Sequence, residues 1–221
     1  MTARAQTVPD ELLGCWQRQW IEFADGDRDD TSFVVWLQLP SLMADVRLSA
    51  AALALAGRTV LSMSDLLVLA ESDSSSGATV CTSVVEGRAV AEWSSGVGFQ
   101  PVSAFPEPGL LEWTADGTVM IERAPSGTYV EEWHLLPESR GPLSHSKLAD
   151  GSQFYQAGSV GVLVRARRGP VPPVDRLTAL TDRAALEATV DCEFSFCQLV
   201  GGAWVVEHST IPARVGAPFS I

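Results

Sequence analysis

Hydrophobic and polar residues alternate along much of this chain with a period of two, which is typical of β-strands buried on one face. The clearest alternation runs over residues 42–48, where Leu, Ala, Val and Leu are separated by Met43, Asp45 and Arg47. Residues 33–39 alternate in the same way before the break at Pro40. Similar patterns predict further strands at residues 15–23, 79–85, 88–94, 110–114, 118–123, 128–136, 160–166, 192–199 and 203–210. About ten strands in succession indicate a mostly-β protein.

Tight turns separate several of these strands and indicate that neighbours run antiparallel. Glu86-Gly87, Ala115-Asp116-Gly117 and Gly201-Gly202 are typical hairpin connections. Longer turns and loops are expected where Gly, Pro and Ser cluster without a clear period, at residues 73–77, 96–109 and 137–157. Because a long antiparallel sheet must close or protect its edges, the pattern predicts an antiparallel β-barrel.

Helical patterns are few and mostly short. One substantial helix is predicted over residues 175–188, with Asp175 as its N-cap and Leu and Ala residues along one side. Shorter helical turns are predicted at residues 49–56 and, after a capping Ser64, at residues 65–71. These pieces leave the strands as the main architecture.

We expect one barrel domain over residues 1–221. Residues 158–210 contain only three predicted strands, which supply too little core for an independent unit. The alternative is a separate small unit with its boundary near residues 140–157.

The segment from Trp36 to Arg47, which reads Trp-Leu-Gln-Leu-Pro-Ser-Leu-Met-Ala-Asp-Val-Arg, is the most distinctive stretch of the sequence. It resembles the calycin-like Hri-type proteins of fungi and their bacterial relatives. Shorter fragments are similar in the same order, at Trp93 with Phe99 and Pro101, Pro108-Gly109, residues 129–133 and residues 209–212. The resemblance implies a lipocalin-like barrel with an internal cavity, and it implies no catalytic residues.

Asp45 and Arg47 are the first candidate site residues, because they share one face of a strand whose other face is apolar. If the apolar face points outward against helices, both side chains enter the barrel lumen. There Arg47 would offer a forked donor to a ligand carboxylate or carbonyl, and Asp45 would orient it. The alternative is a solvated outer face with an ion pair of little energetic value.

A second candidate set lies on the strand at residues 128–136. Tyr129, Glu131 and Trp133 share one face, and Glu132 and His134 share the other. A glutamate beside aromatic walls is expected to have a raised pKa and to shuttle a proton, which makes Glu131 a candidate. His134 is the alternative, because histidine titrates near neutral pH. An edge strand with a solvated Glu132 and His134 face would carry no chemistry.

The chain contains 7 tryptophans, enough to line an aromatic cavity. Trp16, Trp93 and Trp133 are the expected pocket walls, and Arg18 shares the face of Trp16. Such walls would hold a flat apolar group, or stack against a guanidinium. Ordinary core packing is the alternative for all of them.

Charge narrows the range of partners. The 221 residues carry a formal net charge of −12, so the surface repels nucleic-acid phosphates and anionic membranes. The N-terminus lacks the apolar run of a secretory signal, and no stretch reaches the ~18 apolar residues of a membrane span. We therefore expect a cytoplasmic protein with no nucleic-acid or membrane partner.

Metal and cofactor signatures are missing from the sequence. The 4 cysteines are scattered and are expected to be buried, inert thiols. His134, His145 and His208 lie far apart, so no metal site is expected. Haem bound by His208 is a remote alternative. We expect no cofactor.

Three functions remain compatible with these patterns. The leading hypothesis is the binding of a small, largely apolar or amphipathic molecule in the barrel cavity, oriented by Arg47 and Asp45. The second is a cofactor-free isomerase, cyclase, dehydratase or decarboxylase in the same cavity, with Glu131, His134 and Asp45 as acid and base. The third is a protein–protein interaction module with an acidic surface, including a homodimer formed through a symmetric apolar patch.

Overall fold

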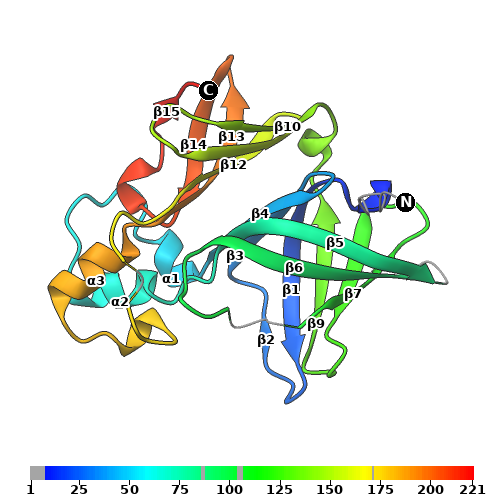
Figure 1. Ribbon diagram of the computed structural model, residues 1–221, viewed down its shortest axis with the longest axis horizontal. Helices are drawn as coiled ribbons and strands as arrows, with labels where there is room; N and C mark the ends of the chain where they lie inside the picture. The colour runs from blue at the N-terminus through cyan, green and yellow to red at the C-terminus, as the bar shows by residue number, and fades with distance from the viewer. Residues whose placement is uncertain (1–7, 86–87, 104–106, 171) are drawn as a thin grey trace, which may run out of the picture.

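The computed structural model describes residues 8–85, 88–103, 107–170 and 172–221. Within them, eight strands form a closed antiparallel ring in the order β1-β3-β4-β5-β6-β7-β8-β9, and β9 pairs with β1 to complete it (Figure 1). Their bounds are β1 (Gly14–Phe23), β3 (Phe33–Gln38), β4 (Leu42–Leu48), β5 (Ser75–Val85), β6 (Arg88–Gly98), β7 (Gly109–Trp113), β8 (Val119–Arg123) and β9 (Tyr129–Leu135). The short β2 (Arg28–Asp29) pairs antiparallel with the end of β1. The expected mostly-β antiparallel barrel is confirmed.

The later strands form a second antiparallel sheet outside the ring, at the top of Figure 1. It consists of β10 (Leu143–Lys147), β11 (Gln153–Ala157), β12 (Val160–Arg165), β13 (Glu193–Val200), β14 (Ala203–Ser209) and β15 (Pro218–Phe219). This sheet contacts the barrel where β11 meets β3 and where β12 and β13 meet β4. The helices α1 (Ala50–Leu53), α2 (Met63–Leu69) and α3 (Arg183–Val190) lie together beside the junction of the two sheets.

The position of the second sheet explains the alternation in β4. Ala44, Val46 and Leu48 point outward and are buried in one hydrophobic cluster with residues of the second sheet and the helices. The intervening Asp45 and Arg47 consequently point into the barrel, because successive side chains of a strand face opposite sides. The outer face of β4 is therefore apolar because the second sheet and the helices cover it, and its charged residues lie on the inner face.

The barrel interior is packed at one end. A buried cluster of Leu12, Trp16, Leu111, Met120 and Trp133 fills this end, and we call it the apolar plug. The Trp16 indole N–H donates to the Leu12 carbonyl over 2.8 Å, which ties the plug to the N-terminal 3₁₀ turn. The other half of the barrel has polar and charged walls.

Two predicted segments differ from the structure. Residues 137–157, expected as a loop, contain β10 and β11. The prediction failed because β10 is an edge strand with partly or fully exposed polar side chains on both faces, so its sequence shows no alternation. Residues 73–77, expected as a turn, include the start of β5 at Ser75.

The helix boundaries also differ. The predicted helix at 175–188 is instead a 3₁₀ turn over Leu177–Ala179 followed by α3, which begins after Asp182. The Leu177 N–H donates to the Gln100 side chain over 3.0 Å, so a tertiary contact satisfies the group that the predicted Asp175 cap would have satisfied. Ser62 rather than Ser64 caps α2, in a reciprocal capping box with Asp65.

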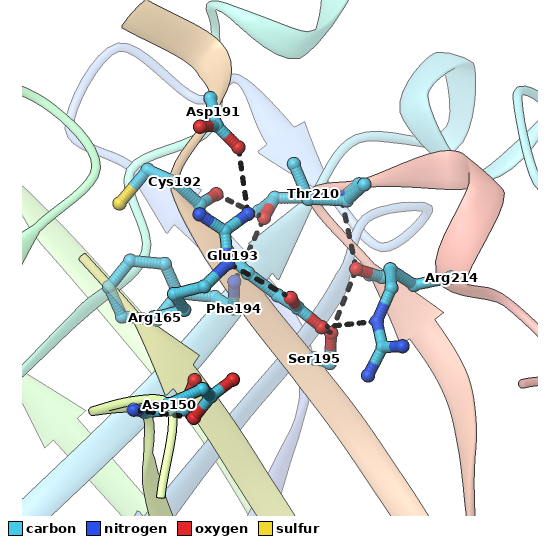
Figure 2. A network of polar contacts seen from close by, with 12 residues as sticks. Asp150, Arg165, Asp191, Cys192, Glu193, Phe194, Ser195, Thr210 and Arg214 are labelled. Carbon is cyan, nitrogen blue, oxygen red and sulfur yellow. Dashed lines mark hydrogen bonds and ion pairs between the residues drawn. The ribbon is translucent and has the colours of Figure 1, made fainter. Parts of the chain in front are cut away.

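A buried ionic network holds the second sheet together (Figure 2). The Glu193 carboxylate accepts hydrogen bonds from Arg214 Nε and Ser195 Oγ, both over 2.9 Å, and lies 3.5 Å from Arg165 Nε. Arg165 Nη2 also donates to Asp191 over 2.7 Å. These contacts link β12, β13 and the turn after β14, and Glu193 is only 4% exposed.

Candidate functional site

The open half of the barrel contains a cavity of about 250 Å³. Apolar and aromatic side chains of Trp36, Met43, Trp93, Pro108 and Tyr129 line part of it. The described charged residues of its wall are the six acids Asp45, Asp73, Glu92, Glu107, Glu122 and Glu131, and one base, Arg47. The cavity thus combines a hydrophobic floor next to the apolar plug with a charged wall toward the mouth.

The aromatic floor is fixed by contacts between rings. Trp36 packs edge-on against Trp93, with ring centroids 5.5 Å apart, and against Trp133 of the apolar plug at 5.9 Å. Gly109 leaves room for this arrangement, because a Cβ there would lie 2.6 Å from Trp93 Cη2 and 2.7 Å from Glu122 Oε1. The missing side chain lets the Trp93 ring and the Glu122 carboxyl share one side of the cavity.

Asp45 and Arg47 form an ion pair in the cavity wall. Arg47 Nε donates to Asp45 Oδ2 over 2.7 Å, and the other Asp45 oxygen accepts the Ser75 backbone N–H. Burial raises the pKa of the Asp45 carboxyl, while the Arg47 charge opposes that rise. Burial alone would lower the pKa of Arg47, but nearby carboxylates raise it above its ordinary value. Arg47 therefore stays cationic, with its side chain 21% exposed.

Arg47 also lies at the boundary with a second hollow of about 250 Å³. Both hollows include Arg47 and Asp73 in their walls, and the second also includes Arg18 and Asp29. Asp73 in turn pairs with Arg176 over 3.1 Å. Arg47 and Asp73 are thus shared by the walls of the two hollows.

Two glutamates face each other across β8 and β9. Glu122 and Glu131 are direct partners in the strand register, point inward and are 4% and 2% exposed. The Tyr129 hydroxyl donates to Glu122 over 3.2 Å, and Arg18 Nη1 donates to Glu131 over 2.9 Å. Burial and the Glu131 charge raise the pKa of Glu122 to about 8. Near neutral pH the pair therefore shares one proton.

This raised pKa predicts a pH dependence of stability. The ordinary value is 4.5, so between pH 4.5 and 8 the folded protein binds a proton at Glu122 that the unfolded chain has lost. That contribution falls as pH rises, by at most ~1.4 kcal/mol per pH unit. Glu122→Gln should gain stability relative to the wild type from pH 5.5 to 7.5, as measured by urea denaturation. Glu132→Gln, which changes an outward-facing residue, should keep the wild-type slope of unfolding free energy against pH. If Glu122→Gln also keeps that slope, the raised pKa of Glu122 is contradicted.

The structure brings five of the predicted site residues together in the cavity wall: Asp45, Arg47, Trp93, Tyr129 and Glu131. Arg18 lies behind Glu131 and pairs also with Asp29 over 2.9 Å. Trp16 and Trp133, expected as pocket walls, are instead fully buried in the apolar plug.

His134 does not reach the cavity. It lies on the outer face of β9, where its Nε2 is 2.9 Å from Glu132 and its side chain is 45% exposed. The strand period explains this position, because residues at odd spacing from Glu131 point outward. His208, the remote haem candidate, lies on the second sheet with its ring 4.2 Å from that of Phe33.

Sequence reasoning missed Glu122, although a signal for it was present. The Pro125-Ser126-Gly127 turn joins β8 to β9, and counting back from it pairs Glu122 with Glu131. Two buried carboxyls on facing positions of a hairpin are unusual, because like charges opposite each other destabilise a sheet. The register of the hairpin, rather than either strand alone, identifies the pair.

Other chemistry is sparse in the described residues. They hold no group of three His, Cys, Asp or Glu side chains arranged to bind a metal ion. Their four cysteines are buried and free, and burial raises the pKa of Cys81 to about 11. None of their helices has both the length and the hydropathy that crossing a membrane requires.

Comparisons with known proteins give a fold but no function. No protein-family model matches the sequence, and no curated protein matches it. The crystal structure of YLR301w, an uncharacterized protein from Saccharomyces cerevisiae, is similar with a TM-score of 0.58. The alignment covers 89% of this chain and 84% of the yeast chain, at 9% sequence identity. This chain therefore shares the barrel-containing fold of the yeast protein YLR301w.

Proposed function

We propose that this protein binds a small amphipathic molecule in the open half of its barrel, where the resemblance to calycin-like Hri-type proteins implies an internal cavity. One observation carries the proposal: buried charged side chains from different strands, including Asp45, Glu122 and Glu131, converge on a cavity beside an aromatic floor. Burying charged groups costs stability, and a filled apolar core would avoid that cost. A ligand-binding role accounts for keeping both the charges and the space.

The two ends of the cavity suit the two ends of such a molecule. Trp36, Met43 and Trp93 would contact its apolar part, which is the usual composition of a ligand pocket. Arg47 and Tyr129 supply donors to its polar part, and the carboxylates supply acceptors. A fungal protein with the same fold supports the resemblance at the level of architecture.

Replacing the aromatic floor should weaken binding. Trp93→Ala removes a large contact surface, so the dissociation constant of the neutral probe N-phenyl-1-naphthylamine should rise about 10- to 100-fold. Fluorescence titration measures this change, because the probe brightens in an apolar site. Trp20→Ala is the matched control, since Trp20 lies under the Arg28 guanidinium, 4.3 Å away, and does not line the cavity. Equal affinities in both variants would contradict binding at this site, and native mass spectrometry of the purified protein tests for a retained molecule.

The carboxyl pair favours an enzyme as the second candidate function. A glutamate with a raised pKa facing a second carboxyl group is a common acid–base arrangement in active sites. Glu122 would donate a proton and Glu131 would accept one, within the same cavity and with no cofactor. If native mass spectrometry identifies a retained molecule, Glu131→Gln should still bind it and should abolish any conversion seen by NMR. Unchanged conversion in this variant would exclude Glu131 as the base.

A further inference from the structure

The charge of the cavity wall indicates which polar group the ligand carries. Six carboxyl groups and one guanidinium line the cavity among the described residues. The arginines behind the wall neutralise only part of this charge, because Arg18 also pairs with Asp29, and Arg176 pairs with Asp73 at the rim. Arg47 is paired with Asp45. The charge of Arg47 acts on Asp45, Glu131 and Glu122 together, so one guanidinium is shared among three carboxyl groups of the wall.

We propose that the ligand is an organic cation with an apolar ring, an inference that rests on the function proposed above. On binding, this cation displaces the proton shared by Glu122 and Glu131. The ammonium group would lie against these two carboxyls, with its ring on Trp36 and Trp93. Aromatic faces and carboxylates together are the usual recognition elements for organic cations. An anionic ligand would meet net repulsion, and a neutral one would leave the excess negative charge of the wall uncompensated.

Proton displacement follows from the geometry of the pair. Two facing, buried carboxylates repel each other, so without a cation beside them the pair keeps one proton. A cation placed beside both offsets the repulsion, and the pair can then ionise fully. The carboxyl proton passes to the solvent buffer, and no covalent bond is made or broken in the ligand. Binding should therefore release protons and strengthen as the pH rises toward 8.

Other charged and titratable groups surround Glu122. Glu131 and Tyr129 face it from β9, Arg47 and Asp45 from β4, and Arg18 lies behind Glu131 on β1. Nearby carboxylates raise the pKa of Arg47 above its ordinary value, and burial raises the pKa of Tyr129 so that its hydroxyl keeps its proton. The carboxyl pair is therefore the source of a proton released near pH 7.

Phenyltrimethylammonium tests the inference, because it is permanently charged and has no proton of its own to lose. Its neutral isostere is tert-butylbenzene, and benzenesulfonate is an anion of similar size. Isothermal titration calorimetry at pH 7 should show at least tenfold tighter binding of the cation than of either other probe. Repeating the titration in phosphate and Tris, whose ionisation enthalpies differ, should show about one proton released per bound cation.

Glu122→Gln separates proton release from binding itself. This variant should release no proton and should lose the rise in cation affinity between pH 6 and 8, while tert-butylbenzene affinity stays as in the wild type and shows that the cavity is intact. Glu132→Gln, changed on the outer face of β9, should behave as the wild type does. Equal binding of cation and neutral isostere would overturn this inference and leave the proposed function standing. Cation binding without proton release would overturn the displacement step, and no binding of any probe would reject the proposed function as well.

Discussion

Glu193→Ala is expected to destabilise the protein by about 3–5 kcal/mol, because it breaks a buried charge network from its centre. The substitution removes the carboxylate that Arg214 binds and one of the two that Arg165 binds, and it removes an acceptor from Ser195. Whole-domain stability is typically about 5–15 kcal/mol, so this loss is a large fraction of the total. Guanidinium denaturation followed by circular dichroism measures it.

A matched control and a milder variant make this result interpretable. Glu207→Ala changes a glutamate of β14 whose side chain is 44% exposed, so its cost should stay below about 1 kcal/mol. Glu193→Gln keeps an acceptor for Ser195 and tests the charge alone if the alanine variant does not fold. A cost below about 1 kcal/mol for both Glu193 variants would show that the network is not important for stability.

Arg18→Met should lower the free energy of unfolding by about 3–5 kcal/mol as well, because it leaves the buried Glu131 carboxylate without its cationic partner. The Arg18 side chain is 7% exposed and bridges Glu131 and Asp29, with both distances at 2.9 Å. Methionine keeps most of the side-chain volume, so the loss reports charge rather than packing. Thermal and urea denaturation at pH 7 provide the measurement.

The control for Arg18 is Arg28→Met on the neighbouring strand. Arg28 pairs with Glu22 at 3.5 Å, and both side chains are about half exposed, at 44% and 53%. Its removal should cost less than about 1 kcal/mol. The double variant Arg18→Met with Glu131→Gln should recover part of the loss, because it removes the charge that the first change left unpaired. If this second change adds a further cost instead, Glu131 does not depend on Arg18.

The barrel itself could be predicted from the sequence because its strands alternate cleanly. In β4 the apolar residues Ala44, Val46 and Leu48 contact a covering layer, and the alternation survives because each face has one environment. The division into a ring and an outer sheet could not be predicted in this way. Alternation shows that a strand has two different faces, but it does not show which strand is its neighbour.

The site could be predicted in part, because alternation along a strand also shows which residues share its polar face. Asp45 and Arg47 were expected in the lumen on the condition that the apolar face of their strand was covered from outside, and that condition is met. Trp133 lies in the apolar plug and His134 on the outer face of β9. A period of two separates the two faces of a strand, but it does not show which face is the inner one or how deep in the barrel a residue lies. Glu122 emerges as a site residue only from the register of the β8–β9 hairpin, which neither strand shows by itself.

The apolar plug determines by which route a bound molecule can enter and leave the barrel. In the described part of the chain it closes one end, so the barrel is a cup rather than a tube. A guest molecule would leave through the mouth by which it entered, and its residence time would depend on the side chains of that rim. Rim substitutions should then change entry and departure rates in the same proportion, leaving the equilibrium occupancy of the deep floor nearly constant.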